Sequence, residues 1–146
     1  MFGFLKKMNK AGAAISEKAV KAENKDLMEA MVGAATLIAF ADGELEDEEI
    51  AAIDAILKNT KALQAFGSEP AQEFDRLCTV LGAGYRMGRL EVMKEISDVK
   101  GNKDESEMVL VMAIEVAYAD GECEPEETKE LEAIAQKLGL RLTDYM

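Results

Sequence analysis

Two short acidic stretches hold the residues of this chain that are best suited to chemistry. Residues 41–49 read Ala-Asp-Gly-Glu-Leu-Glu-Asp-Glu-Glu, and residues 119–127 read Ala-Asp-Gly-Glu-Cys-Glu-Pro-Glu-Glu. The second stretch begins 78 positions after the first, at 119 against 41, and each lies between an apolar and an amphipathic segment. A repeat in matching contexts predicts an internal duplication of a helix–acidic loop–helix unit.

The spacing of acids within each stretch resembles the second half of an EF-hand calcium loop. In that loop an acid precedes an invariant glycine, and a bidentate glutamate follows the glycine by six positions. Asp42 and Glu49 occupy these places in the first stretch, and Asp120 and Glu127 occupy them in the second. The acids that open a calcium loop are missing, because their positions fall in the preceding apolar segment. Each stretch therefore offers about half a coordination shell.

These half-sites predict a weakly bound divalent cation. Calcium takes roughly 6–8 oxygen ligands, so each loop must add waters or the two loops must pool their carboxylates. The chain has no histidine, which makes Ca²⁺ or Mg²⁺ a better fit than Zn²⁺. The candidate ligands are Asp42, Glu46, Glu49, Asp120, Glu124 and Glu127.

A purely structural role for the same acids stays open. Glu46 and Glu124 are placed to cap the following helices, with Glu49 and Glu127 reaching back as in a capping box. Capping does not explain acids at the ends of the preceding helices, where negative charge is unfavourable. The remaining acids form an additional acidic patch of Glu44, Asp47, Glu48, Glu122 and Glu126.

The segments around the loops predict an all-α fold. Residues 30–41 and 108–119 are almost wholly apolar but too short to span a bilayer, so we expect two buried central helices packed on each other. Pro125 fits the first position of a following helix. A further helix is expected through Leu90, Met93 and Ile96. In all we predict about seven helices, no strand, and a pseudo-twofold arrangement of the two units.

The first 24 residues predict a basic amphipathic helix ahead of the main domain. Asn24 or Asp26 is expected to cap the next helix, which gives a single helical domain over 25–146 with repeat units at about 25–60 and 104–139. The N-terminal helix either docks on the domain or lies on an anionic membrane surface. Its candidate contact residues are Phe2, Leu5, Lys6, Lys7 and Lys10.

Composition excludes several classes of function. The net charge is −12 with no basic motif, so nucleic acid is a poor partner. Cys78 and Cys123 are far apart and match no metal–thiolate spacing, which suits a reducing compartment. An acidic, histidine-free chain repels oxyanion substrates and lacks the commonest general base. We therefore predict a protein that is not an enzyme.

The doubled Ala-Asp-Gly-x-x-x-x-x-Glu motif after an apolar helix resembles the tellurite-resistance TerB family. A related domain occurs in the N-terminal part of a membrane-anchored DnaJ-like co-chaperone. The resemblance covers about residues 25–138 and includes both copies of the motif. It implies a duplicated all-helical fold, a role in bacterial resistance to tellurite and related stresses, and divalent metal held by acids. The matching positions here are Asp42, Glu49, Asp120 and Glu127.

The resemblance also implies a cytoplasmic protein that works beside a membrane partner, TerC, with peripheral contact at the inner membrane. Two functions follow from it and from the residues. The first is a non-catalytic module whose acidic loops bind a divalent cation. The alternative is an acidic interaction scaffold that docks on a TerC-like membrane protein without any ion.

Overall fold

The computed structural model describes residues 17–43 and 45–146, and in these residues it is all-helical. Six α-helices and two 3₁₀ helices appear there without a strand, which confirms the predicted all-α class. The helices are α2 (Glu17–Ala39), α3 (Asp47–Asn59), α4 (Glu69–Ala83), α5 (Tyr85–Ser97), α6 (Lys103–Ala117) and α7 (Pro125–Leu138). The 3₁₀ helices are η1 (Lys61–Phe66) and η2 (Leu142–Asp144).

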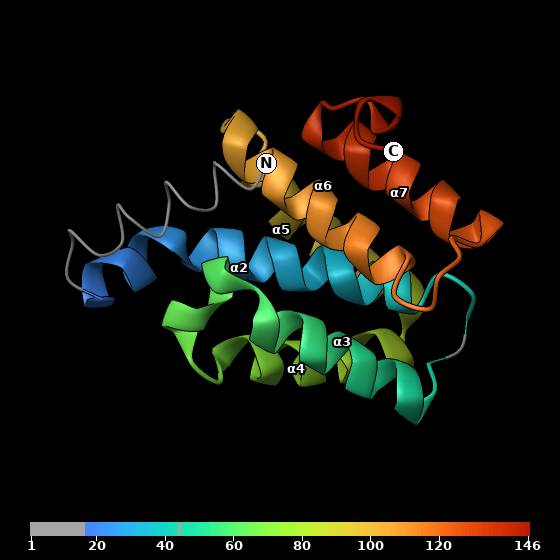
Figure 1. Ribbon diagram of the computed structural model, residues 1–146, viewed down its shortest axis with the longest axis horizontal. Helices are drawn as coiled ribbons and strands as arrows, with labels where there is room; N and C mark the ends of the chain where they lie inside the picture. Colours follow the sequence, from blue (N-terminus) through green and yellow to red (C-terminus); the bar gives the residue numbers. More distant parts are fainter. Residues whose placement is uncertain (1–16, 44) are drawn as a thin grey trace.

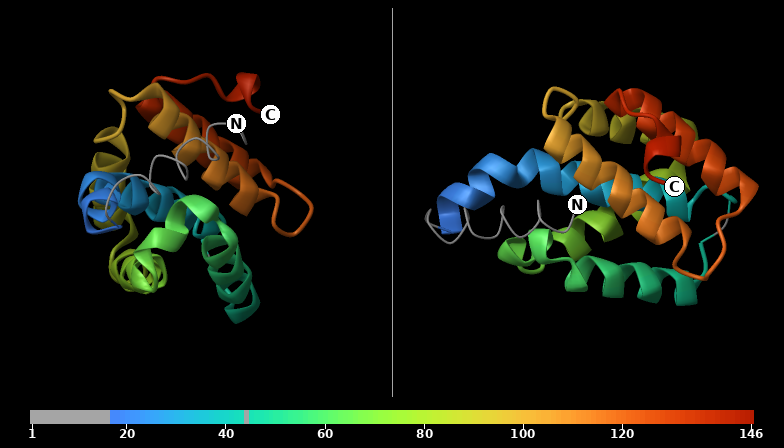
Figure 2. Two further views of the ribbon diagram at one scale, coloured as in Figure 1. Left: turned by 60° about the vertical axis from the view of Figure 1, so that its left-hand side comes forward. Right: turned by 45° about the horizontal axis from the view of Figure 1, so that its top comes forward.

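Helix α2 is the centre of the fold. Every residue from Ala30 to Ala39 is buried, as expected for a helix that is apolar on all sides. It packs most extensively against α6 and also contacts α4, α5 and α7, and Figures 1 and 2 show it passing between the other helices. The predicted packing of the two apolar helices against each other is thereby confirmed. Full duplication of the two units remains a prediction.

The boundary predicted near residue 25 is wrong as a helix start. Helix α2 runs without a break from Glu17 to Ala39, so neither Asn24 nor Asp26 is an N-cap. The alanines and lysines just before Asn24 are good helix formers, and they let the helix continue through it. The five candidate membrane contacts Phe2, Leu5, Lys6, Lys7 and Lys10, and most of the predicted 1–24 helix, lie outside the described residues.

Candidate cation site in the acidic loops

The two acidic loops leave their helices with the same backbone geometry. After α2, the N–H groups of Phe40 and Gly43 donate to the carbonyls of Thr36 and Phe40. After α6, hydrogen bonds join the positions 78 residues later: Tyr118 to Ile114, and Gly121 to Tyr118. Both glycines have a positive φ, 88° for Gly43 and 96° for Gly121, a conformation that side chains rarely adopt. The glycines therefore turn both loops in the same way.

Each loop then enters a helix at the position that the sequence indicates. Glu46 and Glu124 precede α3 and α7 in extended backbone, with φ of −88° and −72°. Pro125 opens α7, where its missing N–H costs nothing. The first turns that follow are acidic, which complements the positive end of the helix dipole.

In the second loop two of the candidate ligands also stabilise the backbone. The Glu127 side chain accepts a hydrogen bond from the Glu124 N–H at 2.9 Å, the return half of a capping box. Asp120 Oδ1 accepts from the Glu122 N–H at 3.2 Å. A carboxylate has two oxygens and about four acceptor positions, so each side chain keeps capacity for a cation. Capping and cation binding are thus compatible in this loop.

The two loops lie side by side at one end of the molecule, where α2 and α6 both end (Figures 1 and 2). The pKa of Glu49 is raised, first by burial, then by Asp42 and Glu46, and also by Asp120 of the other loop. Burial likewise raises the pKa of Glu127. The hydrogen bond from the Glu124 backbone lowers this pKa, and repulsion from Asp120 and Asp42 raises it further. Carboxylates from both loops therefore share one electrostatic environment.

We call this group the acidic pole and define it as the six predicted ligands Asp42, Glu46, Glu49, Asp120, Glu124 and Glu127. Glu49 and Glu127 are half-buried and the other four are exposed. The acids of the additional patch, Asp47, Glu48, Glu122 and Glu126, are exposed as well, and Glu44 lies outside the described residues. Within the described part of the chain, no three acidic-pole carboxylates place oxygens within 4.8 Å of one another. The pole concentrates negative charge without a preformed coordination shell.

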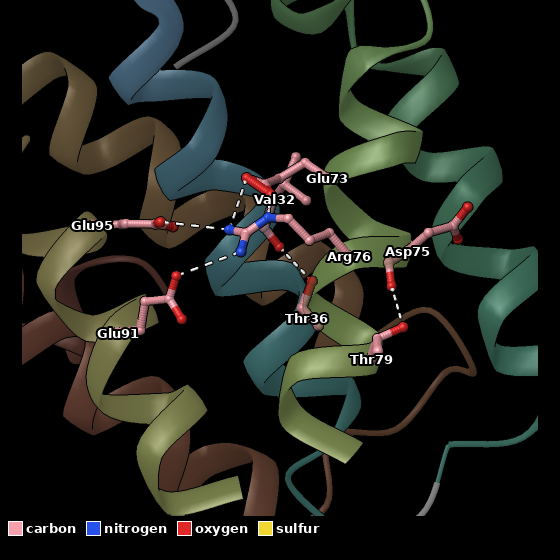
Figure 3. Close-up of polar contacts among 8 residues, drawn as sticks. All are labelled: Val32, Thr36, Glu73, Asp75, Arg76, Thr79, Glu91 and Glu95. Atoms are coloured by element: carbon pink, nitrogen blue, oxygen red, sulfur yellow. Dashed lines mark hydrogen bonds and ion pairs between the residues drawn. The ribbon is translucent and has the colours of Figure 1, made fainter. Parts of the chain in front are cut away.

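A second carboxylate group, which the sequence does not indicate, lies between α2, α4 and α5. Glu29, Glu73 and Glu95 place carboxylate oxygens within 4.8 Å of one another. Arg76 of α4 pairs with Glu73 at 2.5 Å from its Nε and with Glu95 at 3.7 Å from its Nη2 (Figure 3). Glu91 joins at 3.5 Å. We call these five residues the Arg76 cluster.

Burial makes the Arg76 cluster titrate unusually. Burial raises the pKa of Glu95 to about 7, and repulsion from Glu73 and Glu29 adds to this effect. Burial is also the main reason that the pKa of Glu29 is raised. One oxygen of Glu95, Oε2, is buried without a hydrogen-bond partner, whereas Oε1 faces Arg76. A proton on Glu95 removes its negative charge and therefore the repulsion, and it lowers the cost of burying an oxygen that has no hydrogen-bond partner.

The sequence gives only part of the information needed to find the Arg76 cluster. Glu73 and Arg76 are three positions apart, as are neighbours on one helix face, and Glu91 and Glu95 are four apart. Those spacings are common on solvated helices. Only the tertiary packing of three helices brings the residues together, and Glu29 comes from a helix more than forty positions earlier.

The two cysteines are free thiols in different surroundings. Burial raises the pKa of Cys78 to about 11, so the thiol stays protonated at neutral pH. Cys123 is partly buried, and its Sγ lies 3.3 Å from the Thr128 hydroxyl. Both side chains pack against the core.

Comparison with known families decides the relationship. The family model described as "Tellurite resistance protein TerB" matches residues 13–146. The chain belongs to the TerB family. The match contains both acidic loops and every helix from α2 to α7, so the resemblance predicted from the doubled motif is confirmed. No curated protein and no solved structure matches the chain significantly.

The chain is thus a member of a tellurite-resistance family. Among the described residues, no helix has the length and hydrophobicity needed to cross a bilayer.

Proposed function

We propose that this TerB-family protein is a non-catalytic module that binds a divalent cation at its acidic pole and acts beside a membrane protein in tellurite resistance. The observation that carries the proposal is that the two acidic loops lie side by side (Figures 1 and 2). Burial is the main reason that the pKa values of Glu49 and Glu127 are raised, and repulsion from Asp120 on Glu49 and from Asp42 on Glu127 adds to the rise across the two loops. A single cation bound between the two loops would reduce this repulsion.

The chemistry of the donor set selects the class of ion. All six side chains offer carboxylate oxygens, and hard cations such as Ca²⁺ and Mg²⁺ prefer oxygen ligands. Zn²⁺ is less suited, since histidine and clustered thiolates are absent from the sequence. The spread of the carboxylates fits weak binding, because exposed side chains must reorient and waters must complete the shell.

An NMR titration of the ¹⁵N-labelled full chain with Ca²⁺, then Mg²⁺ and Zn²⁺, tests the proposal. Saturable chemical-shift changes are expected in residues 41–49 and 119–127. If the loops pool their ligands, one ion is expected to bind per chain. For a dissociation constant on the order of 1 mM, 10 mM Ca²⁺ stabilises the fold by about 1.4 kcal/mol. Both effects are expected to vanish in Asp42→Asn/Asp120→Asn.

The matched control is Asp75→Asn/Asp98→Asn, which removes the same charge from exposed positions on α4 and at the end of α5. This variant is expected to keep the loop shifts and the Ca²⁺ stabilisation. Loop spectra that do not change up to 10 mM of any of the three ions would overturn the proposal.

The exposure of the acidic pole favours one alternative, an acidic scaffold that docks on basic loops of a TerC-like membrane protein. Four of the six carboxylates are exposed and need no ion to attract a cationic partner. A lysine-rich peptide is the probe. Docking of this kind persists in EDTA and weakens as salt rises, whereas ion-dependent docking is lost in EDTA. We also propose membrane contact through the basic N-terminal segment.

A further inference from the structure

Helices α4 and α5 border an open, largely apolar hollow on the surface, which shares one lining residue, Glu91, with the Arg76 cluster. Its volume is about 590 Å³, and it is lined by Val80, Ala83, Gly84, Met87, Gly88, Leu90, Glu91 and Lys94. Met87 is 75% exposed and Leu90 is 53% exposed, the two most exposed large apolar side chains in the described part of the chain. Two neighbouring apolar side chains left in solvent beside a hollow are typical of an interaction surface.

The sequence holds this surface in a fixed shape. A Cβ on Gly88 would lie 2.8 Å from Leu81 Cδ2, so only glycine lets α5 approach α4 this closely. On the far side, Arg89 pairs with the buried Glu130 of α7 at 2.6 Å, and Tyr85 donates to Glu130 at 3.0 Å. These contacts fix the rotation of α5, and Met87 and Leu90 are thereby kept at the surface.

Helix α5 is also the basic helix of an acidic protein. It carries Arg86, Arg89 and Lys94 against two glutamates, and it is the one α-helix among α2–α7 in which bases outnumber acids. Arg89 is paired with Glu130, whereas Arg86 and Lys94 have no ionic partner in the described residues. Both lie four positions from Leu90, one on each side, so they flank it along one helix face.

We propose that the hollow between α4 and α5 is a docking site for an acidic amphipathic helix of a protein partner. A concave apolar surface suits the apolar stripe of a helix, as in other helix-in-groove complexes. Met87 adds a flexible side chain that adapts to the bound surface. Lys94 lines the hollow and Arg86 precedes Met87, so the two cations select for carboxylates near the two ends of the bound stripe, while the one acid of the lining, Glu91, is paired with Arg76 at 3.5 Å.

The charges argue against two other occupants. The protein's own residues 1–16 contain Lys6, Lys7 and Lys10 and no acid, so Arg86 and Lys94 repel them. An anionic bilayer is a weaker match, because two cations compete with a net charge of −12 and a hollow does not complement a flat surface.

A designed peptide tests the site. The probe is an 18-residue helix with leucines at spacings of three and four on one face and glutamates beside them, and its twin has lysine in place of each glutamate. Binding is measured in EDTA by fluorescence anisotropy and by ¹⁵N NMR of the full chain. The glutamate peptide is expected to shift residues 80–94 saturably and to bind about tenfold more tightly than the twin, a difference of 1.4 kcal/mol.

Variants separate the apolar from the charged contribution. Met87→Ala/Leu90→Ala is expected to weaken binding of the glutamate peptide about tenfold. Met146→Ala, at a side chain that is 49% exposed, is expected to leave this binding unchanged. Arg86→Glu/Lys94→Glu is expected to reverse the preference toward the lysine twin. Its control is Lys103→Glu/Arg141→Glu, at two exposed positions outside the hollow. Circular dichroism verifies that each variant folds.

Several results would overturn the proposal. One is the absence of saturable binding, and another is equal binding of the two peptides. A third is attachment to phosphatidylcholine–phosphatidylglycerol vesicles that Met87→Ala/Leu90→Ala removes, which assigns the surface to lipid. A fourth is a dimer, seen by light scattering, that the same variant dissociates. Retention of peptide binding in Asp42→Asn/Asp120→Asn shows that this site is independent of the acidic pole.

Discussion

The acidic pole and the Arg76 cluster both gather carboxylates, but in opposite environments. At the pole, Glu46, Glu49, Asp120, Glu124 and Glu127 have no lysine or arginine within salt-bridge distance in the described residues. In the Arg76 cluster, one guanidinium is shared by several glutamates, and the Glu73 side chain is only 11% exposed. Solvent screens the repulsion at the pole, whereas in the cluster Arg76 and a proton must offset it.

This difference separates an exposed charged surface, where we propose binding, from a buried structural cluster. Carboxylates that solvent stabilises remain available to an external cation or a cationic partner. Carboxylates that Arg76 stabilises join α4 and α5 (Figure 3), and an external ion would have to displace the arginine. Proximity of oxygens and accessibility therefore favour different groups: the Arg76 cluster is the tighter of the two, and the pole is the more accessible.

The largest expected effect comes from removing the cation of the cluster. Arg76→Met leaves Glu73 and Glu95 without their ionic partner at a largely buried site. Breaking a buried pair costs roughly 3–5 kcal/mol, and because the Arg76 side chain is 46% exposed we expect a loss of about 2–3 kcal/mol in urea unfolding at pH 7.5. Arg86→Met, at an exposed arginine on α5, is the control and is expected to stay within about 0.5 kcal/mol. Equal stabilities of the two variants would contradict a structural role for Arg76.

An intermediate effect is expected from Glu95→Gln, and it depends on pH. The pKa of Glu95 rises from 4.5 to about 7 on folding, so the folded state binds more protons between these values and stability falls as pH increases through them. Glutamine removes that loss. Allowing for solvent screening and for the lost pair with Arg76, we expect a gain of about 1–2 kcal/mol at pH 8 and almost none at pH 4.

The control for this prediction is Glu91→Gln, on the same helix and 3.5 Å from the same arginine, with a side chain 47% exposed. It is expected to change the free energy of unfolding by less than about 0.5 kcal/mol at either pH. A Glu95→Gln effect of the same size at pH 4 and pH 8 would show that packing, and not proton binding, causes it.

The sequence predicts the local features of this fold because local rules decide them. Gly43 and Gly121 end the turns where only glycine is favoured, and Pro125 marks the start of α7. The almost unbroken apolar runs 30–41 and 108–119 identify α2 and α6 as the helices that pack on each other. Spacing alone also places the acids of each loop in equivalent positions.

What the sequence could not predict depends on tertiary packing. The start of α2 was misplaced because a capping residue such as Asn24 also continues a helix when both flanks are helical. The sequence predicted a helix through Leu90, Met93 and Ile96 but not which of them are buried: the rotation of α5 fixed by Glu130 buries Met93 and Ile96 and leaves Leu90 exposed. The Arg76 cluster needs three helices at once, which no local pattern encodes.

The smallest expected effect on stability separates capping from cation binding within the acidic pole. The Glu127 carboxylate accepts a 2.9 Å hydrogen bond from the Glu124 N–H. In Glu127→Gln the side-chain carbonyl can still accept this hydrogen bond, while the negative charge is removed. In EDTA at pH 7 we expect a change of less than about 0.5 kcal/mol, whereas Glu127→Ala loses the cap and about 1 kcal/mol. The Ca²⁺-induced shifts in both loops are expected to weaken in Glu127→Gln, because the Glu127 carboxylate interacts with Asp120 in its own loop and with Asp42 in the other. Glu126→Gln removes an exposed charge from the same turn and serves as the control. Unchanged Ca²⁺ shifts in Glu127→Gln would make Glu127 a cap alone and would confine the cation to the remaining carboxylates.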